Sequence, residues 1–180
     1  MREVYKLWPA SIATDVVEKI METALTQKAQ PGIIFSSRDA KSEIRSCTVR
    51  WLCEQWIEDL VWKYVARANE EGLNLAIEND CELQFVEYQA VCGDHYHWHH
   101  DVDWNGQSPS DRKISATIQL SDPSEYQGGE FEFEAIQTTA DFKSKGTVLV
   151  FPSYLRHRIN AVTSGKRYAL VAWFSGPRWR

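Results

Sequence analysis

The sequence predicts an α+β fold in which amphipathic helices come first and an antiparallel β-sandwich or barrel follows. Two segments of the first 80 residues carry apolar side chains at helical spacing. After Asn79-Asp80 the pattern changes to seven short apolar or alternating runs separated by turn residues. With 180 residues, the chain is long enough for one domain with its own core. We expect residues 1–180 to form that domain, with 1–80 as mainly helical support and 81–180 as the β core.

The first helix is expected from Ser11 to Gln27, where apolar residues follow the helical period and Ser11 or Thr14 can cap the N-terminus. The polar stretch SSRDAKSEIRSC that follows is predicted to be a loop. A second helix is predicted from Trp51 to Asn69, ending before Gly72. The seven runs that predict strands are LQFVEY, HYHWHHDVD, KISATIQL, GEFEFEA, TVLVFP, RHRINAV and YALVAWF.

Composition and charge exclude several classes of protein. The net charge of −5 argues against general binding to nucleic acid or to an anionic membrane. Four cysteines show no CxxC spacing, and the N-terminus has no apolar signal region. No apolar run reaches the ~18 residues that a membrane helix needs. We therefore expect a cytoplasmic protein with reduced thiols and no membrane partner.

Charge is distributed unevenly along the β core. Asp122 to Glu134 carries five acidic residues and no basic one, whereas Arg156 to Arg180 carries six basic residues and no acidic one. An acidic sheet face and a basic tail explain most of these charges. A function in binding an anion requires at least one of the cations to lie inside a pocket.

Four of the five histidines lie between His95 and His100, and the fifth is His157. On a strand with alternating side chains, one face can hold His95, His97, His99, Asp101 and Asp103. Spacing alone therefore offers His97/His99, His99/Asp101 and Asp101/Asp103 as chelating pairs.

Two metal chemistries follow from these pairs. Two imidazoles and one carboxylate on one face of an octahedral metal form the site of non-haem Fe(II) oxygenases, and His157 is the only distant histidine that can complete His99 and Asp101. The pair His97/His99 instead suggests a cupin-type or hydrolytic metal enzyme. A non-enzymatic β-sandwich with a histidine-rich surface strand is a third reading.

Arg167 is the candidate for the buried cation. It opens the last apolar run, and alternation places it with Val171 and Trp173 on the face opposite Tyr168 and Leu170. A planar guanidinium inside a sandwich needs an anionic partner, and a carboxylate bound by two hydrogen bonds suits it.

Four segments of the sequence together resemble the Fe(II)/2-oxoglutarate-dependent dioxygenases of the prolyl 4-hydroxylase-like family. They are GDHYHWHHD, RKISATIQLSD with YQGGEFEF, KGTVLVFPSYLRHRINAV and GKRYALVAWFSGP, and they occur in the family's order. The resemblance implies a double-stranded β-helix, or jelly roll, as the β core. It also implies Fe(II), 2-oxoglutarate and O2 as cofactors, ascorbate as an accessory reductant, and a peptide or protein as substrate.

The resemblance assigns roles to nine residues. The metal ligands are His99, Asp101 and His157; the residues at 2-oxoglutarate are Arg167, Tyr88, Gln119 and Trp173; the residues at the substrate are Tyr96 and Arg112. The implied reaction hydroxylates a C–H bond of a peptidyl prolyl residue and releases succinate and CO2. A free amino acid or another small molecule is the alternative substrate.

Three positions depart from the family pattern. Four residues separate Tyr88 from Gly93, which is wider than the family's usual spacing. Gln119 stands where related enzymes often have tyrosine. Glu130-Phe131 follows the Gly128-Gly129 pair where collagen-type enzymes tend to have a threonine. By alternation, Trp98 and His100 are expected to pack on the other face of the histidine strand, and His97 and Asp103 to flank the metal.

Overall fold

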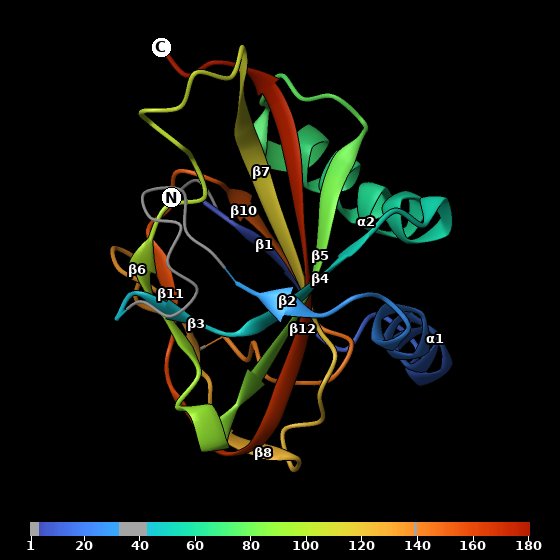
Figure 1. Cartoon of the computed structure of the whole chain (residues 1–180). Coiled ribbons are helices and arrows are strands. Elements are labelled where there is room, and N and C mark those ends of the chain that lie inside the picture. The colour runs from blue at the N-terminus through green and yellow to red at the C-terminus, as the bar shows by residue number, and fades with distance from the viewer. Residues whose placement is uncertain (1–3, 33–42, 139) are drawn as a thin grey trace.

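The computed structural model describes residues 4–32, 43–138 and 140–180. It consists of two antiparallel sheets that face each other, with two helices on the outer side of the larger sheet (Figure 1). Residues 36–42 of the predicted polar loop lie outside the described residues. The α+β jelly-roll prediction is confirmed by this architecture.

The larger sheet has eight strands and provides one wall of the sandwich. Its order is β1 (Lys6–Trp8), β10 (Val148–Pro152), β7 (Ser110–Gln119), β12 (Val162–Pro177), β5 (Cys81–Gln89), β4 (Thr48–Leu52) and β2 (Gln30–Pro31), and β8 (Tyr126–Gly128) pairs with β12. The 16-residue strand β12 pairs with β5 along one edge and with β7 along the other. Its side chains therefore occupy the centre of the sheet.

The smaller sheet has four strands and provides the opposite wall. Its order is β3 (Arg45–Ser46), β6 (His95–His99), β11 (His157–Ile159) and β9 (Phe131–Phe133). On its outer face, acidic residues of β9 and its flanks pair with basic residues of β11 and its flanks. Glu132 lies directly opposite Arg158, and their side chains meet at 2.7 Å, while Glu134 pairs with Arg156 at 2.6 Å. Much of the uneven charge in the sequence thus forms cross-strand ion pairs.

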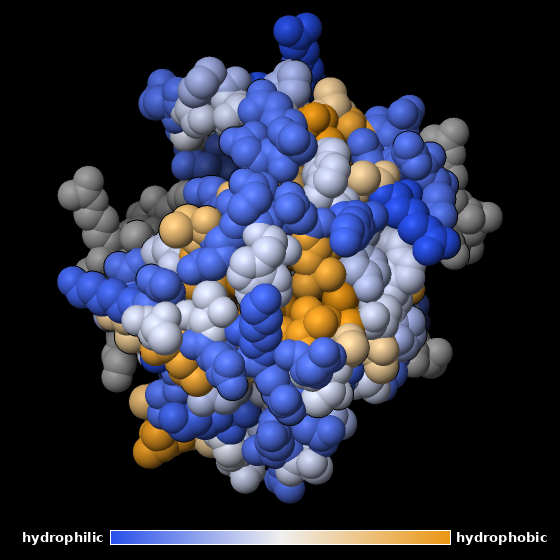
Figure 2. All heavy atoms as spheres, turned by 90° about the vertical axis from the view of Figure 1, so that its right-hand side faces the viewer, coloured by the Kyte–Doolittle hydropathy of each residue, from blue (hydrophilic) through white to orange (hydrophobic). Residues whose placement is uncertain are grey.

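Helices α1 (Thr14–Leu25) and α2 (Gln55–Ala68) cover the outer face of the larger sheet and bury the main apolar core there. A π-helical turn at Asn69–Leu73 follows α2, and a 3-10 turn at Ala90–Cys92 follows β5. The helical face of the molecule is mostly hydrophilic, with apolar side chains visible in a narrow band (Figure 2). Neither helix, and no other described helix, combines the length and apolar character needed to cross a membrane.

The boundaries of the first half differ from the sequence prediction. Helix α1 begins at Thr14 after Ala13, and no side chain caps it. The predicted start of the second helix was wrong, because Trp51 and Leu52 belong to β4 and the helix begins at Gln55. In β4, Val49 is buried on one face of the larger sheet and Leu52 on the other. This burial in the sheet has a stronger effect than the helical spacing of the apolar residues. Arg45–Ser46, predicted as loop, pairs with β6.

Candidate functional site

Two histidines and one aspartate converge at the end of the smaller sheet. His99 ends β6, His157 begins β11, and the register of these strands places the two residues directly opposite each other. Asp101 follows β6 and lies with its carboxylate 3.5 Å from His99 Nε2 and 3.7 Å from His157 Nε2. One potential ligand atom of each residue lies within 4.8 Å of the others. This is the metal-binding geometry that the sequence predicted for these three residues.

Backbone carbonyls orient both histidine rings. His99 Nδ1 lies 2.8 Å from the carbonyl oxygen of His97, and His157 Nδ1 lies 2.9 Å from that of Leu155. A carbonyl can only accept a hydrogen bond, so each Nδ1 carries a proton, and Nε2 is the ring nitrogen that can bind a metal. Burial lowers the pKa of His157 to about 4, which keeps its imidazole neutral near pH 7.

Asp101 is held by a buried pair of serines. Ser115 of β7 donates from Oγ to Asp101 Oδ2 at 2.7 Å, and Ser153 Oγ lies 2.9 Å from Ser115 Oγ. The backbone N–H of Asp101 donates to the carbonyl of Ser153. Burial alone would raise the pKa of the Asp101 carboxyl, but the neighbouring rings of His157 and His99 and the hydrogen bond from Ser115 hold this pKa well below its ordinary value. Asp101 is therefore an ionised ligand of fixed orientation.

An irregularity in β6 decides which residues of the histidine strand face the cavity. The register of β6 with β11 shifts between His99 and Tyr96, so these two residues, three apart, turn to the same side. Their rings stack with centroids 3.4 Å apart, and burial raises the pKa of Tyr96 to about 12. The expectation that His97 shares the metal face was wrong, because His97 is exposed. Asp103 lies beyond the strand and caps the N–H of Asn105.

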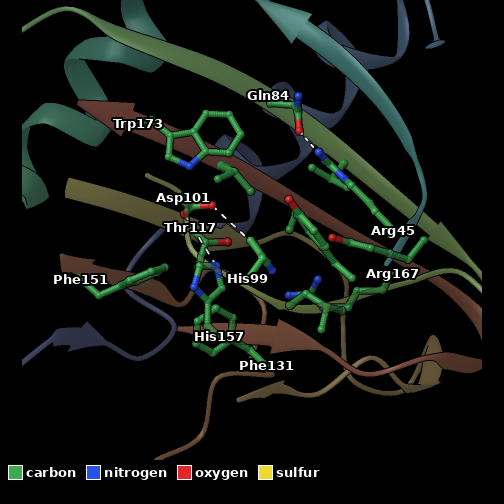
Figure 3. A pocket seen from close by; sticks show the side chains of 16 residues that line it. Arg45, Gln84, His99, Asp101, Thr117, Phe131, Phe151, His157, Arg167 and Trp173 are labelled. Atoms are coloured by element: carbon green, nitrogen blue, oxygen red, sulfur yellow. Dashed lines mark hydrogen bonds and ion pairs between the residues drawn. The ribbon is translucent and has the colours of Figure 1, made fainter. Parts of the chain in front are cut away.

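The metal cluster opens into a cavity between the sheets of ≈ 480 Å³, including its open mouth. Arg167 of β12 lines this cavity and is 4% exposed. Within the described ranges its guanidinium makes no ion pair or hydrogen bond, and its contact is with the ring of Tyr88 at 5.7 Å. Figure 3 shows Arg167, His99 and His157 around the same space. A buried guanidinium without a carboxylate partner is a site for an external anion.

The Gly-Gly turn after β8 makes room for the Arg167 side chain. Gly129 has a φ of +63°, and a Cβ there would lie 2.9 Å from Arg167 Cδ and 3.1 Å from Val162 Cγ2. A side chain at Gly129 would therefore displace the stem that carries the guanidinium into the cavity.

Comparison with known proteins identifies the family. A sequence model described as the 2OG-Fe(II) oxygenase superfamily matches residues 83–175. The chain belongs to the 2OG-Fe(II) oxygenase superfamily. Its relatives include a PKHD-type hydroxylase of Prochlorococcus marinus, 40% identical over 82 residues, which are 45% of this chain and 36% of that protein. The alignment thus spans well under two thirds of the relative's length.

Solved structures share the 2OG-Fe(II) oxygenase fold over nearly the whole chain. A prolyl-4-hydroxylase of Pseudomonas putida matches with a TM-score of 0.72 and 20% identity, covering 97% of this chain and 93% of that one. A prolyl hydroxylase of Trichoplax adhaerens, in complex with a hypoxia inducible factor oxygen degradation domain peptide fragment, matches with a TM-score of 0.75 and 15% identity, covering 95% and 83%. The chain therefore shares its fold with these two prolyl hydroxylases.

The donor set fits the cofactors that this superfamily implies. Two imidazoles and an ionised carboxylate on one side of a metal suit Fe(II) and leave positions for other ligands. Arg167 supplies the cation that a dicarboxylate cofactor needs at its far end. Both features lie in one cavity, so Fe(II) and 2-oxoglutarate fit the residues present.

Four other predicted site residues have distinct positions. Tyr88 and Trp173 line the main cavity, and burial raises the pKa of Tyr88 above its ordinary value. Gln119 instead lines a smaller cavity behind Arg167, and its Nε2 donates to Tyr126 Oη at 3.1 Å. Arg112 lies behind Trp173, with its guanidinium over the indole ring.

Sequence reasoning missed Arg45, Gln84 and Ser115. Arg45 of β3 is 7% exposed, lines the cavity, and donates across the sandwich to Gln84 Oε1 at 2.7 Å. It also lies 4.6 Å from the centre of the Tyr96 ring. A buried arginine in a polar stretch has no periodic pattern around it, so only the strand pairing reveals it. Ser115 could have been suspected from its place inside the apolar run KISATIQL.

Proposed function

We propose that this protein is an Fe(II)- and 2-oxoglutarate-dependent dioxygenase that hydroxylates a C–H bond of a peptidyl prolyl residue. The observation that carries the proposal is one cavity that contains both the cluster of His99, Asp101 and His157 and the buried guanidinium of Arg167. A non-enzymatic metal-binding module gives no reason for Arg167 to face that cluster. A site based on His97 and His99 is less well supported, because His97 is exposed and does not belong to the cluster of potential ligands among the described residues.

Each residue has a defined task in this proposal. His99 and His157 bind Fe(II) through Nε2, with their rings oriented by backbone carbonyls, and Asp101 adds the charge of its carboxylate. Arg167 pairs with the distal carboxylate of 2-oxoglutarate, beside Tyr88. The bound Fe(II) and 2-oxoglutarate supply the oxidising chemistry with O2, which yields succinate, CO2 and a hydroxylated product. The two sheets hold these groups in a largely apolar space that limits access of water.

The proposal of a prolyl substrate is supported by the similarity of the whole fold to prolyl hydroxylases. Both solved structures compared above are prolyl hydroxylases, and one holds a peptide. In this chain, Trp51 is 43% exposed and lies against Trp173, with ring centroids 6.2 Å apart, at the edge of the cavity. Exposed aromatic surface next to a metal site suits a substrate that is part of a longer chain. Ascorbate, as a reductant that keeps iron ferrous, belongs to the same proposal.

Product analysis tests the proposed reaction. Purified protein with Fe(II), ascorbate, 2-oxoglutarate and O2 is incubated with a panel of proline-containing peptides. We expect O2-dependent formation of succinate and a mass gain of one oxygen atom on proline, and neither with the His157→Ala variant. Succinate without oxidised peptide would reject the prolyl substrate and leave a small molecule as the target. Absence of succinate under all conditions would reject the dioxygenase itself.

A further inference from the structure

The indole nitrogen of Trp173 is a buried donor without an acceptor. Trp173 lies on β12 and is 6% exposed, and none of the described side chains or carbonyls accepts a hydrogen bond from its Nε1. Buried donors are nearly always paired in native proteins. An unpaired N–H at the wall of a functional cavity indicates that a bound ligand supplies the acceptor.

This donor lies beside the metal cluster. Trp173 is directly opposite Ser115 in the pairing of β12 with β7, and Ser115 holds Asp101. In Figure 3 the indole nitrogen is on the edge of the ring that faces Asp101 and the cavity. An acceptor for this N–H would therefore lie next to the metal.

The position of Trp173 favours the substrate over 2-oxoglutarate as the source of the acceptor. Arg167 and Trp173 are six residues apart on β12, which corresponds to roughly 20 Å along an extended strand. A five-carbon diacid that binds Arg167 at one end and the metal cluster at the other does not extend to Trp173. The N–H thus lies on the far side of the cluster from the Arg167 end, where the substrate must place its reacting C–H bond.

We propose that the Trp173 N–H binds an oxygen acceptor of the substrate, such as the carbonyl group next to the hydroxylated carbon. This proposal rests on the dioxygenase activity proposed above. It assigns a substrate with a carbonyl oxygen close to the reacting C–H bond, as a peptidyl proline has.

Arg112 has a different task from the direct substrate contact expected from the family. Its guanidinium lies 3.8 Å from the centre of the Trp173 ring, and its Nε and Nη2 bind Glu82 Oε2 at 2.7 and 2.6 Å. The Arg112 side chain is 13% exposed. Trp51 contacts the Trp173 ring as well, at 6.2 Å between centroids. Arg112 is therefore a positioning residue that fixes the indole so that its N–H faces the cavity.

Phenylalanine at position 173 tests the donor, because it keeps an aromatic ring and removes the N–H. We expect Trp173→Phe to lower kcat/KM for the best prolyl peptide of the panel by about 3- to 10-fold, the effect of one lost hydrogen bond. The 2-oxoglutarate concentration for half-maximal rate should stay within about twofold, since that ligand binds elsewhere. Trp56→Phe, on helix α2 and away from the cavity, is the matched control and should leave both quantities unchanged.

Three outcomes of the activity assays overturn the donor role. They are an unchanged kcat/KM in Trp173→Phe, a loss that appears as weaker 2-oxoglutarate binding, and a wild-type enzyme that oxidises no prolyl peptide. Only the last also rejects the prolyl substrate of the proposed function.

A measurement on the wild type does not depend on the activity of a variant. The indole ¹H–¹⁵N signal of Trp173 can be assigned by its loss in Trp173→Phe. In the wild-type protein with Zn(II) and 2-oxoglutarate, this signal should move downfield when the peptide is added. An unmoved signal rejects the hydrogen bond.

A double-mutant cycle tests the positioning role of Arg112. If Arg112 acts through the indole N–H, Arg112→Gln lowers kcat/KM in the wild type but has no further effect in Trp173→Phe. Arg112→Lys, which keeps the charge next to Glu82 but cannot stack as a plane, should recover only part of the activity. Additive losses in the double variant would mean that Arg112 contacts the substrate itself, and would overturn this part of the proposal.

Discussion

Two groups of residues around the cavity differ in how the chain builds them. The first group comes from β6, β11 and β12, which bring His99, His157 and Arg167 together from the second half of the sequence. The second group combines β3, β4 and β5, where Arg45 and Trp51 come from the first half. The family match at residues 83–175 includes the whole first group but neither Arg45 nor Trp51. The chemistry of the cofactor requires particular residue types, whereas that chemistry does not require Arg45 or Trp51.

The largest expected effect is on the metal ligands. His157→Ala should abolish Fe(II)-dependent formation of succinate, because a two-residue cluster no longer provides the facial set of ligands. His97→Ala is the control from the same histidine-rich segment, since His97 is exposed. Turnover assays with added Fe(II) measure both. Full activity of His157→Ala, or equal loss in His97→Ala, would contradict the assignment.

Arg167 is expected to act on 2-oxoglutarate alone. Arg167→Gln should raise the 2-oxoglutarate concentration for half-maximal rate by about 10- to 100-fold, because a hydrogen bond to a charged group contributes about 1.5–3 kcal/mol. Arg158→Gln removes a cation from the outer face of the smaller sheet and should leave this concentration unchanged. The assignment of Arg167 to the cofactor fails if its substitution leaves this concentration unchanged.

Ser115 is expected to affect the metal through Asp101. Ser115→Ala removes the hydrogen bond to Asp101 Oδ2. The affinity for Fe(II) should fall by about 10-fold, which is the smaller end of the loss seen when a hydrogen-bond partner of a metal ligand is removed. Ser153→Ala, one step further from Asp101, should have a smaller effect. Competition with a chelator measures both affinities without turnover. Equal affinities in wild type and Ser115→Ala would show that Asp101 keeps its orientation unaided.

Arg45 is expected to affect stability more than cofactor binding. Arg45→Met leaves Gln84 Oε1 without its donor across the sandwich, which should lower the free energy of unfolding by about 1–3 kcal/mol. Arg156→Met, which removes an exposed ion pair, should cost less than about 1 kcal/mol. Chemical denaturation measures both. A large rise in the 2-oxoglutarate requirement of Arg45→Met would assign Arg45 to the cofactor and remove the contrast between the two groups of residues.

The same contrast explains which features could be predicted from the sequence. His99, Asp101, His157 and Arg167 could be predicted because they match the motifs of the family that the sequence resembles, and alternation in β12 correctly placed Arg167 with Trp173. The side assigned to His97 was wrong because alternation cannot reveal the irregular register that turns Tyr96 toward His99.

Features that depend on pairing between distant strands could not be predicted. Arg45 becomes part of the site because β3 joins β6, and Trp51 because β4 joins β5. Helical spacing after Trp51 concealed the strand that precedes α2. Gln119 lies behind Arg167, where its side chain donates to Tyr126 of another strand. No local pattern in the sequence predicts this contact.

The most direct test of the central claim is an anaerobic titration of the Fe(II) protein with 2-oxoglutarate, followed by visible absorption. Chelation of 2-oxoglutarate to Fe(II) held by protein gives a weak charge-transfer band. The wild type should show this band, Arg167→Gln should show it only at higher 2-oxoglutarate concentration, and His157→Ala should not show it. No band in the wild type, or an undiminished band in His157→Ala, would contradict a cavity built for Fe(II) and 2-oxoglutarate.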